Sequence, residues 1–311
     1  MKNVLVTGGA GFIGSHVVER LVAEGHHVVV VDDLSMGQRE NLPDSSLVDF
    51  YEESITDCEF MEELLVKNDF DVIYLLAAIA SVADTVARPY ETHAVNQEAN
   101  LFILKTLHEQ GKTPDRIIFA SSAAVYGPRE GAPKVETDAV EPLTAYAIDK
   151  YATERFVLAY ANLYNMNAVA VRFFNVYGPR QNPASPYSGV LSIIINALKQ
   201  GKTFTLFGDG EQTRDFVYVK DVVAALKFSS RIKRLLGTCS MLQQEHHVRC
   251  WKQFLIAKKQ QDVSWQLILR RCVKGILKSQ QQILVVFVQW DTNQRMRLTK
   301  GFLNIGEKQN E

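Results

Sequence analysis

The segment that most constrains the fold is VLVTGGAGFIG, residues 4–14, in which an apolar run leads directly into a glycine-rich turn. The run predicts a buried strand, and residues 16–25 carry apolar side chains at helical spacing, so the glycines join a strand to a helix. The spacing of Gly8, Gly11 and Gly14 makes the turn, lets the backbone approach a phosphate and lets the helix pack close to the strand. Free N–H groups at the helix N-terminus then suit a dinucleotide pyrophosphate.

A second predicted strand supports this interpretation over that of a flexible glycine loop. The strand HHVVVVDDL ends in Asp32, about twenty residues after the glycines, where an acidic side chain would bind the ribose 2′-hydroxyl of a dinucleotide. A carboxylate at this position would repel a 2′-phosphate. The sequence therefore predicts a Rossmann-type dinucleotide site that favours NAD over NADP.

Tyr146 and Lys150 form a second constellation in TAYAIDKYATERF. Four residues apart on a helix, which Thr144 can cap, their side chains share one face. A lysine ammonium near a phenol stabilises the phenolate, so the pair predicts a tyrosine that acts as a base closer to neutral pH. A solvated helical face is the alternative, but the pair follows the apolar strand IIFASS, which ends in Ser121 and Ser122. The carboxyl end of such a strand is where a parallel sheet binds its ligands.

Together these motifs resemble the extended short-chain dehydrogenase/reductases, and most of all their NAD-dependent nucleotide-sugar epimerases of the UDP-glucose 4-epimerase type. The resemblance runs over residues 1–228 and rests, besides Tyr146 and Lys150, on TGGAGFIG, DDLS, SSAAVYG, RFFNVYGPRQ and GDGEQTRDFVYVKD. It implies an α/β fold, a Rossmann-type doubly wound parallel sheet with a smaller substrate-binding lobe. The strands VLVTG, HVVVVD, VIYLLAA, IIFASS and AVAVRFF alternate with helical patterns as that fold requires.

The resemblance also implies a mechanism. Ser122 would hydrogen-bond a sugar hydroxyl, Tyr146 would remove its proton, and Lys150 would hold the nicotinamide ribose. NAD would take the C4 hydride and return it to the other face of a transient 4-keto sugar. Asn175 and Arg214 would hold the substrate diphosphate, and no metal is involved. The implied cofactor contacts are Gly8, Gly11, Phe12, Ile13, Gly14, Asp32, Asp33, Ser35, Ile55, Ala77, Ala78, Tyr146, Lys150 and Phe174.

One departure narrows the reaction within this family. The related sugar 4,6-dehydratases carry an Asp-Glu pair after the Ser or Thr of this strand end, and the pair is needed to eliminate water. This chain has Ala123 and Ala124 there. Two methyl groups cannot act as a general acid and base, which argues against dehydration.

Composition gives no sign of other partners. The formal net charge of −1 does not indicate binding to nucleic acid or to an anionic membrane. The sequence shows no leader pattern and no run of eighteen apolar residues. We therefore expect a soluble, cytoplasmic protein.

Four cysteines without CxxC spacing predict neither a metal site nor a disulfide framework. The family resemblance implies a homodimer through helices near residues 96–110 and 147–164, although their apolar stripes suit an intramolecular core equally well.

Charge divides the chain sharply. Residues 229–311 contain fifteen Lys or Arg and five Asp or Glu, leaving residues 1–228 with a net charge of −11. We predict an NAD-binding Rossmann domain over residues 1–174, which also receives part of 213–228, and part of the substrate-binding lobe over 175–212. Residues 229–311 form an atypical basic tail without a recognisable nucleic-acid-binding motif.

We interpret this tail as an out-of-frame translation of the family's own C-terminal region. Shifted by one reading frame, with only synonymous codons chosen freely, residues 237–254 can be read as NVFYVTTGTPRTLLETI and residues 272–306 as a sequence like the family's closing segment. The single-codon residues Met241, Trp251, Trp290 and Met296 fit without adjustment. The substrate-binding lobe would then be incomplete or disrupted. The alternatives are an active epimerase, another NAD-dependent nucleotide-sugar oxidoreductase, or an inactive NAD-binding product.

Overall fold

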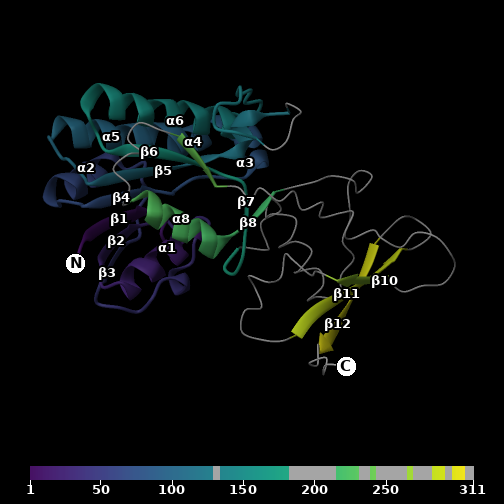
Figure 1. The fold of residues 1–311 in the computed structure, drawn as a ribbon. Coiled ribbons are helices and arrows are strands. Elements are labelled where there is room, and N and C mark those ends of the chain that lie inside the picture. Colours follow the sequence, from purple (N-terminus) through teal and green to yellow (C-terminus); the bar gives the residue numbers. More distant parts are fainter. Residues whose placement is uncertain are drawn as a thin grey trace.

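The structure is a computed structural model that describes residues 1–128, 134–181, 215–230 and 239–242, together with three strands between residues 265 and 304. At its centre is a seven-stranded sheet in which all neighbouring strands are parallel, in the order β3-β2-β1-β4-β5-β6-β9 (Figure 1). The strands are β1 Asn3–Thr7, β2 His27–Val31, β3 Val48–Tyr51, β4 Val72–Leu75, β5 Arg116–Ser122, β6 Ala168–Phe173 and β9 Cys239–Leu242. The five strands predicted from the sequence are present, and β3 and β9 join them at the two edges.

Alternate side chains of these strands enter two separate hydrophobic cores. Val4 and Val6 of β1 pack on the face covered by α1 and α8, whereas Leu5 packs on the face covered by α2, α5 and α6. Figure 1 shows these two groups of helices on opposite sides of the sheet. Both faces of a parallel sheet are thus buried, which confirms the predicted doubly wound architecture. The helices are α1 Phe12–Ala23, α2 Cys58–Lys67, α3 Val82–Ala87, α4 Pro89–His93, α5 Ala99–Glu109, α6 Ala145–Tyr164 and α8 Val219–Ser229, with short turns η1 Arg39–Asn41, η2 Ala94–Glu98 and η3 Ala123–Tyr126.

Local signals in the sequence set both ends of α6. The Thr144 side chain accepts a hydrogen bond from the backbone N–H of Ala147 at 3.2 Å, which caps the first turn as predicted. Asn165 ends the helix in the left-handed conformation, with φ of 53°. The helix passes beside β5 and β6, and it therefore brings Tyr146 and Lys150 to the carboxyl end of the sheet.

The chain leaves the main sheet after β6 and forms a small second sheet. Strands β7 Asn175–Tyr177 and β8 Phe216–Tyr218 pair in parallel, although about forty residues separate them in the sequence. Residues 182–214, which hold most of the predicted substrate-binding lobe, lie outside the described residues. Among the described residues, no helix is long and apolar enough to cross a membrane.

Part of the basic tail belongs to the main sheet, which the sequence analysis did not anticipate. Strand β9 pairs with β6, with Ala170 opposite Cys239 and Phe173 opposite Leu242. Parallel pairing uses backbone groups, so the open edge of β6 can accept a short strand of almost any composition. Further strands, β10 Trp265–Ile268, β11 Gln282–Trp290 and β12 Met296–Asn304, form an antiparallel sheet of their own. We predict that residues 232–311 do not form a cooperative domain, because a sequence produced by a frame change has no reason to match its hydrophobic period to secondary structure.

Candidate active site

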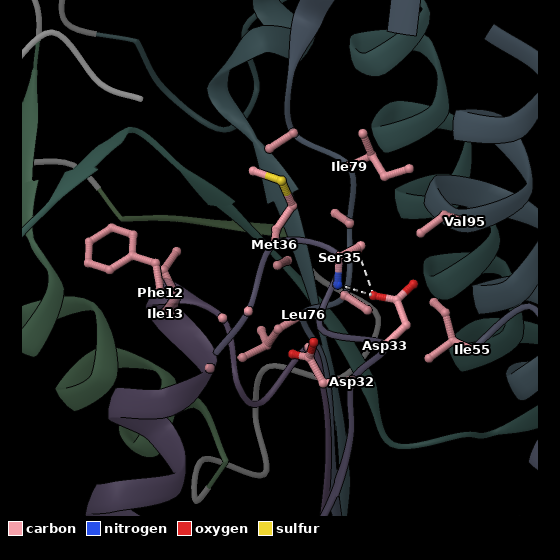
Figure 2. A pocket seen from close by; sticks show the side chains of 18 of the residues that line it. Phe12, Ile13, Asp32, Asp33, Ser35, Met36, Ile55, Leu76, Ile79 and Val95 are labelled. Atoms are coloured by element: carbon pink, nitrogen blue, oxygen red, sulfur yellow. Dashed lines mark hydrogen bonds between the residues drawn. The ribbon is translucent and has the colours of Figure 1, made fainter. Parts of the chain in front are cut away.

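A pocket of about 380 Å³ lies where five central strands end. Its walls follow β1, β2 and β4 and include the last residues of β5 and β6, so it occupies the carboxyl edge of the sheet. The pocket is lined by Ser122 and by every expected cofactor contact, namely Gly8, Gly11, Phe12, Ile13, Gly14, Asp32, Asp33, Ser35, Ile55, Ala77, Ala78, Tyr146, Lys150 and Phe174. Figure 2 shows Asp32 and Asp33 from the end of β2 near Ile55, with Asp33 accepting the hydrogen bonds of Ser35.

The glycine turn is shaped by close backbone contacts. Gly8 has φ of +68°, and a Cβ there would lie 2.7 Å from the backbone nitrogen of Ala77. A Cβ on Gly14 would lie 2.1 Å from the carbonyl oxygen of Gly8. Gly11 precedes α1 without a side-chain cap, so the first N–H groups of this helix are available to a ligand. The turn therefore fits the pyrophosphate of a dinucleotide.

Asp32 is buried at the base of this pocket. Its carboxylate accepts hydrogen bonds from the backbone N–H groups of Ala10, at 2.9 Å, and Leu34, at 3.0 Å. Burial raises the pKa of Asp32, and these two hydrogen bonds oppose the rise. The backbone thus fixes the carboxylate orientation beside the glycine turn, in the position expected for a ribose-binding acid.

Ser122, Tyr146 and Lys150 meet on the opposite wall. Lys150 is 2% exposed, and its Nζ lies 4.8 Å from the ring centre of Phe119 and 6.0 Å from that of Tyr146. Burial lowers the pKa of Lys150 to about 7, with the charge of Asp149 opposing this effect. The pocket therefore holds a lysine that changes its protonation state near neutral pH.

The predicted effect of Lys150 on Tyr146 needs correction. We expected the ammonium to lower the tyrosine pKa, but burial raises the pKa of Tyr146, and the nearby Ser122 hydroxyl opposes the rise. The reason is that loss of water around the phenol disfavours the phenolate more than its neighbours favour it.

Of the expected substrate-binding pair, the structure describes only Asn175, and this residue lies outside the pocket. Asn175 is exposed at the start of β7 and does not line the pocket; its side-chain amide donates to the carbonyl oxygen of Asp215 at 2.8 Å. Arg214 lies outside the described residues. Ala123 and Ala124 begin the turn η3, where the N–H of Ala124 donates to the hydroxyl of Ser122 at 3.2 Å.

Sequence reasoning missed Asn96, which shapes another wall. Its side chain accepts a hydrogen bond from the N–H of Ile79 at 2.9 Å and donates to the carbonyl oxygen of the same residue at 3.1 Å. Ile79 and Val95 both line the pocket. Asn96 lies in the π-helical turn η2, a feature that often marks functional sites. An asparagine within a helical pattern gives no signal of such a turn.

Comparisons with known proteins agree with this geometry. The model of the NAD dependent epimerase/dehydratase family matches residues 4–233. A UDP-glucose 4-epimerase from Mycolicibacterium smegmatis is 40% identical over 225 residues, which are 71% of each chain. A UDP-N-acetyl-alpha-D-glucosaminuronate decarboxylase from Bacillus cytotoxicus is 38% identical over 238 residues, covering 72% of this chain and 70% of its own. The structure of UDP-glucose 4-epimerase from Thermotoga maritima with UDP-glucose aligns with a TM-score of 0.75, at 37% identity, over 81% of both chains.

The lowered pKa of Lys150 predicts a specific dependence of stability on pH. Its folded-state pKa of about 7 lies below the ordinary value of 10.5, so between these values the unfolded state binds more protons and the free energy of unfolding rises with pH. Relative to Lys150→Met, the wild-type protein should gain about 2 kcal/mol between pH 7 and pH 9. Urea unfolding without added NAD measures this difference, with the exposed Lys105→Met as control. Parallel stability curves for wild type and Lys150→Met would contradict the buried, titrating lysine.

Proposed function

Since this chain belongs to the NAD dependent epimerase/dehydratase family, an enzyme family that uses NAD, we propose that it interconverts UDP-glucose and UDP-galactose by epimerisation at C4. The observation that carries the proposal is that Ser122, Tyr146 and Lys150 line the same pocket as the glycine turn and Asp32. A proton acceptor thus faces the site of a hydride-accepting cofactor. The relatives named UDP-glucose 4-epimerase support the choice of sugar.

Most of these pocket residues would bind the cofactor, and Tyr146 would act on the substrate. The glycine turn and the N-terminus of α1 would bind the pyrophosphate, and Asp32 would accept a hydrogen bond from a ribose hydroxyl. When bound, NAD supplies a hydride acceptor that can return the hydride to the sugar. Lys150 would hold the nicotinamide ribose. Tyr146 then needs only to reach the sugar hydroxyl.

Proton transfer falls to Tyr146, with Ser122 as its partner. Ser122 lines the pocket together with Tyr146, where its hydroxyl would hydrogen-bond the sugar hydroxyl and hold it toward the phenol. Tyr146 takes the hydroxyl proton as the hydride leaves C4, and returns it when the hydride comes back on the other face. The resulting 4-keto sugar must rotate within the pocket between these two steps.

A second candidate is decarboxylation of a nucleotide sugar acid, which begins with the same oxidation. It is favoured by relatives named as decarboxylases, one of them a UDP-glucuronic acid decarboxylase from Xenopus tropicalis that is 33% identical over 230 residues. Dehydration is not favoured, because Ala123 and Ala124 offer no acid or base. Assays with UDP-glucose and UDP-glucuronic acid in parallel separate the two reactions by their products.

Replacing Tyr146 with Phe in a protein whose reading frame has been restored should abolish epimerisation while leaving NAD bound. The change removes the proton acceptor but little volume, so turnover should fall by about a hundredfold or more. Activity assays and NAD affinity, measured on the same preparations, test both parts. Turnover in Tyr146→Phe equal to that of the frame-restored parent would show that another group is the base, whereas a frame-restored chain that binds NAD but converts no nucleotide sugar would contradict the proposed activity.

We further propose that the chain leaves the family's reading frame after about residue 230. The end of the family match at residue 233 supports this, as does the change in charge at the same point. The sugar-binding lobe would then lack its usual C-terminal part, which would reduce activity.

The homodimer and the cytoplasmic location stay predictions. Helix α6 has the exposed apolar side chains that a dimer contact needs, namely Ile148, Phe156 and Leu163.

Sequencing the gene across codons 225–240 tests the frame directly. We expect that insertion or deletion of one base there restores a C-terminal sequence like that of the family, and that the corrected protein gains epimerase activity. A gene that encodes the same tail in related strains, in a fully active enzyme, would contradict the proposal.

A further inference from the structure

Behind the pocket lies a buried ion pair that the proposed mechanism does not use. Arg172 on β6 and Glu154 on α6 are 4% and 1% exposed. Two parallel hydrogen bonds join them, from Nη2 to Oε1 at 2.6 Å and from Nε to Oε2 at 2.9 Å. Removing two charges from water is costly, and a buried pair is often no more stabilising than apolar residues of the same volume. Its position therefore points to a role other than stability.

The pair is connected to the active site through Ser121. The Ser121 hydroxyl donates to Oε2 of Glu154 at 2.7 Å, and Ser121 lies opposite Arg172 in the pairing of β5 with β6. The next residue along β5 is Ser122. Glu154 also lies one and two helical turns beyond Lys150 and Tyr146, on the same face of α6. One carboxylate thus joins the helix that carries Tyr146 to the strand end that carries Ser122.

Arg172, the other member of the ion pair, is also held by further hydrogen bonds. Arg172 Nη1 donates to the hydroxyl of Tyr126 at 2.6 Å and to the carbonyl oxygen of Glu136 at 3.3 Å. Burial alone would lower the pKa of Arg172, but its bonds to Glu154 raise the pKa overall. The guanidinium is therefore permanently charged and held in one orientation. On the outside, β9 covers this network, with the Sδ of Met241 2.7 Å from the hydroxyl of Tyr126.

We propose that Glu154 and Arg172 are positioning residues that fix the end of β5 against α6 and so set the separation of the Ser122 hydroxyl from the Tyr146 phenol. This inference rests on the proposed function only in taking these two groups as the catalytic pair. If the link through Ser121 is lost, the end of β5 can shift relative to α6. The Ser122 hydroxyl then lies farther from the phenol, and the phenolate of Tyr146 loses a stabilising neighbour.

The experiment measures the Tyr146 titration itself, so it does not depend on turnover. Tyrosine labelled at Cζ with ¹³C reports each phenol by NMR in the NAD-loaded full chain, and Tyr146→Phe assigns the resonance. Ser121→Ala removes the link but leaves Glu154 paired with Arg172. The Tyr146 pKa should rise by about 0.5 in Ser121→Ala. The matched control is Ser229→Ala, another buried serine, whose hydroxyl donates to the carbonyl oxygen of Ala225 in α8.

A double-mutant cycle distinguishes positioning from a general loosening of the fold. In Ser122→Ala the Tyr146 pKa rises, and adding Ser121→Ala should raise it no further, because the effect acts through Ser122. Glu154→Gln, which loosens the same link more severely, should reproduce the shift if it folds. An unchanged pKa in Ser121→Ala, or an equal shift with and without Ser122, would overturn the inference. A chain without epimerase activity would contradict the proposed function but leave this titration informative.

Discussion

The whole site depends on the close approach of two chain segments at the carboxyl end of β1. Strand β1 has β2 on one side and β4 on the other, so the chain turns away in opposite directions from this point and leaves a crevice. At its floor, Gly8 lies so close to Ala77 that no side chain fits between them. This contact joins the phosphate-binding turn to the segment after β4. The remaining walls, from β5, β6 and α6, then close around the same crevice.

Burial is the second physical constraint on this site. It raises the pKa of Tyr146 and lowers that of Lys150, so both groups are displaced toward their neutral forms. Neutral groups cost less to bury, and each can still exchange a proton with a partner. Behind them lies the buried ion pair of Arg172 and Glu154, with Nη2 and Oε1 2.6 Å apart. The site thus combines proton-exchanging groups with a fixed charged support behind them.

Much of the fold and of the cofactor site could be predicted from the sequence, because they rest on local patterns. Apolar runs, glycine spacing and Thr144 as a helix cap act within a few residues, and the structure has the strands and the helix that they predict. The direction of the Tyr146 pKa could not be predicted, since it depends on burial by distant elements. Glu154 and Arg172 gave no signal either, because each is an ordinary charged residue until α6 packs on the sheet.

The two edge strands of the sheet, β3 and β9, could not be predicted from the sequence either. Strand β3 alternates partly buried and exposed residues over only four positions, too few for a clear period. Strand β9 consists of four residues in a tail whose composition differs from the rest of the chain, and its place depends on the open edge of β6. Short edge strands are decided by the sheet that they join rather than by their own residues.

The central claim is that one pocket removes a hydride from C4 of a nucleotide sugar and returns it to the same carbon. The direct measurement is NMR of the product formed from UDP-glucose that carries deuterium at C4, with the NAD-loaded, frame-restored protein in ordinary water. The account predicts UDP-galactose that retains deuterium at C4, because the hydride never leaves the pocket. UDP-galactose with hydrogen at C4, which would require exchange with solvent, or the absence of any conversion would contradict it.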